Sequence, residues 1–142
     1  MKIRSCFVSN SSSSSFIVNS IDTENVIHRL ENLFGVKYPN QNGDSVRIFT
    51  FTEDTPKEVR REYVKEMEDL TFWKFIDDEE SYENYCKENS WFKKNNPTFK
   101  SVPEYERVRN GNTYIVTSEN YFSYNAIELI DYEFNTKHYH LG

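Results

Sequence analysis

The chain has 142 residues, the usual size of one domain and enough to bury a hydrophobic core. Its 23 acidic and 17 basic residues give a net charge of −6, which disfavours general binding to the phosphate backbone of nucleic acids. No stretch approaches the ~20 apolar residues that span a bilayer, and serines after Val8 interrupt any signal-peptide core. We therefore expect a cytoplasmic protein with no membrane partner.

Aromatic side chains are abundant, with 11 Phe, 10 Tyr and 2 Trp making up 16% of the residues. Each ring buries roughly 150–250 Å², so a few rings can build a core. We expect most of them to be core residues. The alternative is that the surplus of Tyr and Trp lines a binding surface.

Two short strands are predicted near the start, over residues 1–8 and 16–18, because both runs are rich in β-branched and aromatic residues. Residues 9–15 between them form a predicted serine-rich loop. Successive amides and hydroxyls in such a loop can cradle an anion, which makes Ser11, Ser12 and Ser13 candidate ligand-binding residues. A mobile surface connector is the other interpretation.

The next predicted helix follows Asp22 or Thr23 and ends at Gly35, where a left-handed residue closes the last turn. Apolar residues recur on one face at the three-and-four spacing of a helix: Val26, Ile27, Leu30, Leu33 and Phe34. A loop over residues 38–44 and a strand over residues 46–51 follow.

The best local signal is Thr55-Pro56-Lys57-Glu58, which combines an N-cap, a proline at the first helical position and a glutamate three residues after the cap. It predicts a helix over residues 55–76. The core-facing stripe consists of Val59, Tyr63, Met67 and Leu70. The charged residues of the other faces, among them Arg60, Arg61 and Glu66, are predicted to contact water.

A second helix is predicted over residues 79–92, directly after the first and without a strand between them. The acidic residues 77–80 and Ser81 complement the positive end of this helix. The alternative for these carboxylates is a divalent-cation site. Asn95-Asn96-Pro97 ends the helical segment.

Asn110-Gly111 is a strong turn dipeptide, and it predicts a hairpin between residues 105–109 and 112–117. A last helix carries Ala126, Ile127, Ile130 and Phe134 and ends at Asn135, and a strand follows over residues 136–141. The fold class is α+β, with a mixed or antiparallel sheet of about four to six strands covered by three or four helices. Residues 1–142 form a single domain.

Signatures of catalysis are absent from the sequence. Four glycines build no phosphate-cradling loop, and Cys6 and Cys86 have no metal spacing, so we expect two free thiols. His138 and His140 are two residues apart on a predicted strand, so both side chains lie on one face. They could supply two ligands of a metal site, which would need a third ligand from elsewhere in the chain. Exposure at a sheet edge is the simpler interpretation. We expect no catalytic residue, metal or cofactor.

The segment Phe7-Val-Ser-Asn-Ser-Ser-Ser-Ser-Ser-Phe16 resembles the opening of many small proteins of bacteriophages, prophages and other bacterial mobile elements. Those proteins carry a glycine before the phenylalanine, where this chain has Cys6. The resemblance covers about ten residues. The resemblance implies that the gene comes from a phage or another mobile element and that these proteins share a processing or recruitment step in the host. It implies no enzymatic activity.

These observations favour a non-catalytic binding protein of phage or mobile-element origin. Its partner is a host protein, including one of host defence, or a small ligand. The candidate ligand-binding residues are Ser11, Ser12, Ser13, Tyr114, Tyr124, His138 and His140. The alternatives are a small enzyme whose site is assembled in space from carboxylates and histidines, and a phage structural or accessory protein.

Overall fold

The computed structural model describes residues 14–41, 44–71, 74–103, 107–117 and 120–140. The predicted strand over residues 1–8 lies outside these ranges, as do Cys6, Ser11, Ser12 and Ser13. In chain order the elements are β1 (Ser14–Asn19), α1 (Thr23–Phe34), β2 (Val46–Thr50), α2 (Lys57–Thr71), α3 (Glu79–Glu88), α4 (Ser90–Asn95), the 3₁₀ helix η1 (Phe99–Ser101), β3 (Asn112–Thr117), α5 (Asn120–Phe134) and β4 (Lys137–His140). The predicted α+β class is confirmed.

The four strands form one antiparallel sheet in the order β2-β3-β1-β4. β3 is central, and all six of its residues are buried. Phe16 of β1 lies opposite Ile115 of β3 on one side and opposite His140 of β4 on the other. The strand β1 begins at Ser14, two residues before the predicted start, because Ser14 and Ser15 pair with Thr117 and Val116 of β3.

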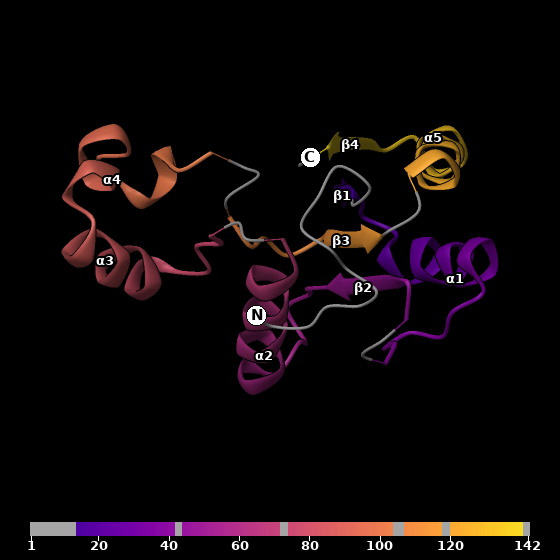
Figure 1. Cartoon of the computed structure of the whole chain (residues 1–142), viewed down its shortest axis with the longest axis horizontal. Coiled ribbons are helices and arrows are strands. Elements are labelled where there is room, and N and C mark those ends of the chain that lie inside the picture. Colours follow the sequence, from indigo (N-terminus) through magenta and orange to yellow (C-terminus); the bar gives the residue numbers. More distant parts are fainter. Residues whose placement is uncertain (1–13, 42–43, 72–73, 104–106, 118–119, 141–142) are drawn as a thin grey trace.

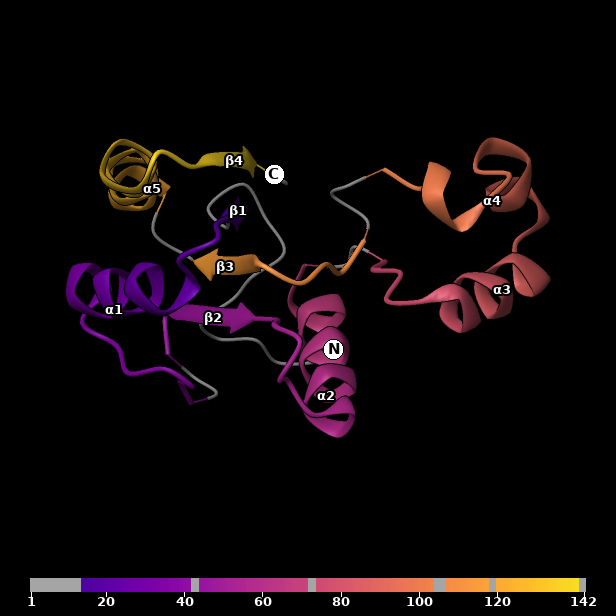
Figure 2. The same cartoon turned by 180° about the vertical axis from the view of Figure 1, so that it is seen from behind.

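Helices cover both faces of the sheet. On one face, Phe16 and Ile115 pack with Leu30 of α1 and Ile127 of α5 in one hydrophobic cluster. α1 and α5 lie side by side in both views of the molecule (Figures 1 and 2). Residues of the opposite face, including Ile17, pack against α2. The alternation of side chains along each strand therefore supplies two separate cores.

Three of the four residues of the predicted α2 stripe pack as expected, while Val59 is only half-buried and the cluster takes in Val64 instead. Met67 is 1% exposed, and Tyr63 and Leu70 are half-buried against the same cluster. Two charged residues of α2 differ from the prediction, because they do not contact water alone. Arg60 pairs with Asp77 at 2.7 Å, and Glu66 accepts a hydrogen bond from the buried Arg47 of β2.

The start of α2 also differs from the prediction. The Thr55 hydroxyl accepts a hydrogen bond from the Thr52 amide at 2.8 Å, so it closes the turn before the helix. The first helical bond runs from the Arg60 amide to the Pro56 carbonyl at 2.9 Å. The helix therefore begins at Lys57.

The helix predicted over residues 79–92 is divided into α3 and α4 at Asn89. The backbone of Asn89 has φ −136° and ψ 83°, outside the helical region, and its side chain donates to the Tyr85 carbonyl. α3 begins with a capping box between Asp78 and Ser81, which confirms the interpretation of these residues as a helix start. The division raises the α-helix count of the described chain to five, above the three or four expected.

α3 and α4 form a unit of their own. Ile76, Tyr82, Cys86, Phe92 and Val102 make a third hydrophobic cluster, separate from those of the sheet. In Figures 1 and 2 the two helices lie at the end of the long axis opposite α1 and α5. The Cys86 thiol in this cluster is buried and free.

The predicted hairpin is wrong, although its turn is present. The Asn112 amide bonds to the Arg109 carbonyl at 3.1 Å, and Gly111 has φ 91°, as this turn requires. The described residues just before the turn, 107–109, do not pair with β3. The Val108 amide instead bonds to the carbonyl of Ile76 at 2.9 Å, while β3 pairs with β1 and β2. Pairing with β1 and β2 occupies both edges of β3 and places it in the middle of the sheet, whereas a two-stranded hairpin would leave one edge open.

Candidate functional site

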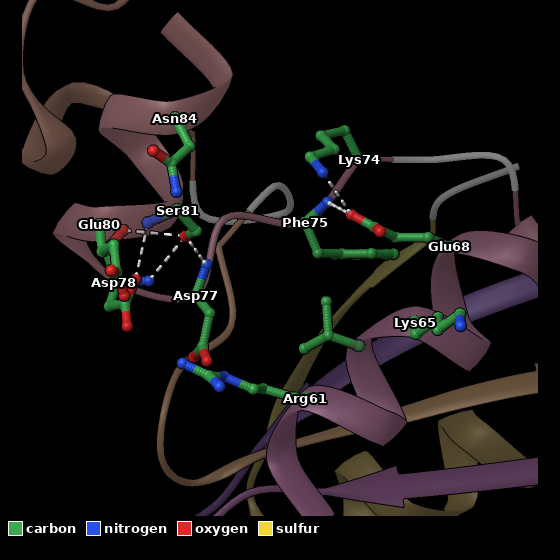
Figure 3. Close-up of a pocket in the computed structure, with 11 residues that line it drawn as sticks. Arg61, Lys65, Glu68, Lys74, Phe75, Asp77, Asp78, Glu80, Ser81 and Asn84 are labelled. Carbon is green, nitrogen blue, oxygen red and sulfur yellow. Dashed lines mark hydrogen bonds and ion pairs between the residues drawn. The ribbon is translucent and has the colours of Figure 1, made fainter. Parts of the chain in front are cut away.

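A cleft of about 260 Å³ lies between α2 and the start of α3. Residues of α2 line one side and residues at the start of α3 line the other, as Figure 3 shows. The lining is mostly charged or polar, and its apolar members are Val64 and Phe75. The two helices that form the walls belong to different hydrophobic clusters, so the cleft marks the boundary between the sheet and the α3–α4 unit.

Several polar groups of the cleft are already bonded within the chain. The Glu68 carboxylate accepts from the Phe75 amide at 3.0 Å and lies 3.3 Å from the Lys74 amine. The Ser81 hydroxyl accepts from the amides of Asp77 and Asp78, at 2.9 and 3.0 Å (Figure 3). These bonds order the groups within each wall. The Ser81 hydroxyl, which also donates to the Asp78 carbonyl, has no capacity left for a ligand, whereas Glu68 uses only one carboxylate oxygen.

Other polar groups of the cleft have no hydrogen-bond or ion-pair partner among the described residues. They are Arg61 and Lys65 on α2 and Glu80 and Asn84 on α3. Figure 3 shows Arg61 reaching from α2 toward the α3 side, near Asp77. Asp77 is already paired with Arg60, so the Arg61 guanidinium brings further positive charge to that side of the cleft. A cation from one wall and a carboxylate and an amide from the other suit a small polar ligand.

A second depression, of about 590 Å³, lies between the turn after β1 and the end of α5. Its two charged residues, Asp22 and Glu133, already accept hydrogen bonds from other side chains of the chain. Glu133 accepts from Arg29 at 2.8 and 3.1 Å, which lowers the pKa of the Glu133 carboxyl, and Asp22 accepts from Asn25. This depression therefore offers fewer free polar groups than the cleft.

Three of the residues predicted from the sequence are brought together at α5 and β4. The Phe16 ring is stacked with His140 at 5.0 Å and contacts Tyr124 edge-on at 5.3 Å, and His138 lies 6.0 Å away. The Tyr124 hydroxyl is 2.8 Å from Nδ1 of His140. The prediction that both histidines share one face of their strand is confirmed, because both contact Phe16.

The histidine face also carries a carboxylate. Nδ1 of His138 lies 2.5 Å from the Asp131 carboxylate, which also accepts from the Thr136 hydroxyl at 2.6 Å. Because a carboxylate only accepts, Nδ1 carries the proton of this contact. Burial lowers the pKa of His140, and the neighbouring His138 adds to this effect. Among the described residues, no group of three or more His, Cys, Asp and Glu side chains is arranged to hold a metal ion.

Tyr114 lies apart from these residues, on the α2 face of the sheet. It is 2% exposed, and its hydroxyl donates to the Arg107 carbonyl at 2.7 Å and accepts from Asn112. Burial raises the pKa of Tyr114 to about 12. Its contacts are those of a core residue, which fits the expectation that most rings build the core.

The sequence reasoning considered the carboxylates of residues 77–80 only as a helix start or a divalent-cation site, and it missed the other cleft residues. Arg61 and Asn84 occupy ordinary solvent-facing positions of two helices, and nothing in their spacing distinguishes them. The one available signal was the direct succession of two helices without a strand, which places two polar helix faces close together.

Comparison with protein-family models, with curated proteins and with solved structures found no match to this chain. Within the described ranges, none of the helices has the length and apolar character needed to cross a bilayer.

Proposed function

We propose that the chain is a non-catalytic binding protein that holds a small polar ligand in the cleft between α2 and α3. The observation that carries this proposal is the set of unpaired groups on opposite walls, above all the Arg61 guanidinium facing α3. Charged groups scattered over a protein surface are usually solvated by water or paired with a neighbouring charge. Their convergence in a cleft with fixed walls is typical of a ligand site.

The biological setting is part of the proposal. The segment from Phe7 to Phe16 supports an origin in a phage or another mobile element acting in the bacterial cytoplasm. A small polar metabolite of the host is then the expected ligand of the cleft, and a host protein, including one of host defence, is the alternative partner.

The test is native mass spectrometry of the tagged protein recovered from bacterial lysate. We expect a mass adduct on the wild-type chain that is lost in Arg61→Gln. Lys57→Gln is the matched control, because it removes a charge from an exposed position of the same helix outside the cleft. An adduct that persists in Arg61→Gln, or a wild-type chain without an adduct, would contradict the proposal.

The enzyme alternative has one observation in its favour, the contact between His138 and Asp131 beside Tyr124 and His140. An imidazole oriented by a carboxylate presents Nε2 as a base. This alternative predicts turnover of chromogenic carboxylic or phosphate esters that is abolished by His138→Gln. No turnover of either class by the wild-type chain would leave binding as the proposed function.

A further inference from the structure

The outer surface of α4 has a different chemistry from the rest of the chain. Residues 87–103 contain four lysines against a single glutamate, whereas the chain as a whole carries a charge of −6. The lysines are Lys87, Lys93, Lys94 and Lys100, and all four are exposed. Among the described residues none of them forms an ion pair, so their charge is directed to solvent.

An aromatic ring lies among these lysines. Trp91 of α4 is 56% exposed, more than any described phenylalanine side chain. Its ring meets Phe92 edge-on at 5.7 Å and Tyr85 edge-on at 6.4 Å. Phe92 is buried in the cluster of the α3–α4 unit. The inner side of the Trp91 ring is therefore supported, and the remainder contacts water.

Trp91 and Lys94 are three residues apart on α4, a spacing that places them on neighbouring parts of the helix surface. The Lys74 amine, which pairs with Glu68, lies 5.3 Å from the Tyr85 ring centroid and helps to hold this ring in place. Rigid aromatic side chains with a polar rim are the usual anchors of protein interfaces.

We propose that the exposed surface of α4 that carries Trp91 and its neighbour Lys94, with Lys93 next to Lys94 in the chain, binds an acidic segment of a partner protein. An apolar side chain of the segment covers the Trp91 ring, and its carboxylates pair with the exposed lysines of α4, first of all Lys94. The site is separate from the ligand cleft and goes beyond the function proposed for it. A protein segment is favoured over a nucleic acid, because the rest of this acidic chain repels an extended polyanion.

The test uses fluorescein-labelled peptides in which Asp and Glu alternate with Leu and Phe, measured by fluorescence anisotropy at low and physiological salt. We expect binding that weakens as salt rises, because the exposed charges are screened. Peptides with Lys in place of the acidic residues should not bind. Trp91→Ala should weaken binding by about fivefold or more, the effect of losing an interface anchor.

Charge variants make the test independent of any effect of Trp91→Ala on folding. Lys93→Gln/Lys94→Gln changes only exposed positions and should weaken binding and flatten its salt dependence. The matched control is Lys37→Gln/Lys57→Gln, which removes the same charge from exposed positions on other parts of the chain and should leave binding unchanged.

Four results would overturn the proposal. They are absence of binding to any acidic peptide, equal weakening by the control pair, equal or tighter binding of single-stranded DNA of the same charge, and self-association through this surface in analytical ultracentrifugation. Arg61→Gln distinguishes the two proposals, since it should abolish the cleft adduct and leave peptide binding intact. If the peptides fail and the adduct remains, only the α4 inference is wrong.

Discussion

The contact between Arg47 of β2 and Glu66 of α2 joins the sheet to one wall of the cleft, and its removal gives the sharpest test of the fold. The Arg47 side chain is 5% exposed, and its Nη2 lies 2.6 Å from the Glu66 carboxylate, which is 27% exposed. The same guanidinium donates to the Asn40 carbonyl and lies 5.1 Å from the Phe49 ring centroid. Glu66→Ala leaves this buried cation without its counter-charge.

The expected loss follows from these contacts. Breaking a fully buried ion pair by removing one partner costs about 3–5 kcal/mol. The Glu66 carboxylate is partly solvated, and Arg47 keeps its contacts with Asn40 and Phe49, so the loss is expected nearer that of one charge-assisted hydrogen bond. We expect about 2 kcal/mol of unfolding free energy.

The assay is urea denaturation followed by circular dichroism, with the denaturant slope held constant between variants. Glu62→Ala is the matched control, because Glu62 is an exposed glutamate one turn earlier on α2. It should change stability by less than about 0.5 kcal/mol. In an Arg47→Met background, Glu66→Ala should cost little, because no buried charge remains. If Glu66→Ala costs the same in both backgrounds, the ion pair does not explain the loss.

Three further predictions concern other parts of the chain. Asp78→Ala removes the side-chain cap of α3 and should cost about 0.5–2 kcal/mol in thermal denaturation. Because burial lowers the pKa of His140 below 6.5, the unfolded chain takes up more protons as the pH falls through that value. Stability should therefore decline toward acid, and less so in His140→Gln, as measured by urea midpoints across the range. Thiol titration of the denatured, unreduced chain should count two thiols, Cys6 and Cys86.

The elements with a clear apolar period could be predicted from the sequence. The stripe on α2 and the face of α1 carry their signal in local spacing, and Gly35 ends α1 with φ 67° as expected. Asn135, with φ 53°, likewise ends the last helix. Such signals depend on residues that are close together in the chain, so these helices and their ends can be predicted from the sequence alone.

Features that depend on residues far apart in the chain, such as strand pairing and ion pairs, could not be predicted from the sequence. Asn110-Gly111 correctly indicated a turn, but the choice of partner for β3 depends on β1 and β2, far away in the sequence. Arg60 and Glu66 are charged residues at positions of α2 that local spacing assigns to solvent. Only the fold shows that Arg60 lies beside Asp77 and that Glu66 lies beside Arg47. The division of residues 79–95 at Asn89 was missed because asparagine only weakly opposes a helix.

The architecture explains why both proposed sites lie toward the α3–α4 end of the molecule. The sheet buries one face under α1 and α5 and the other under α2, so its central side chains are committed to two cores. The α3–α4 unit has a small cluster of its own and lies apart from the sheet (Figure 1), so its outer residues are free of that packing. Its junction with α2 forms the cleft, and its far surface carries Trp91. Substitutions at either place should therefore alter binding while leaving the sheet intact.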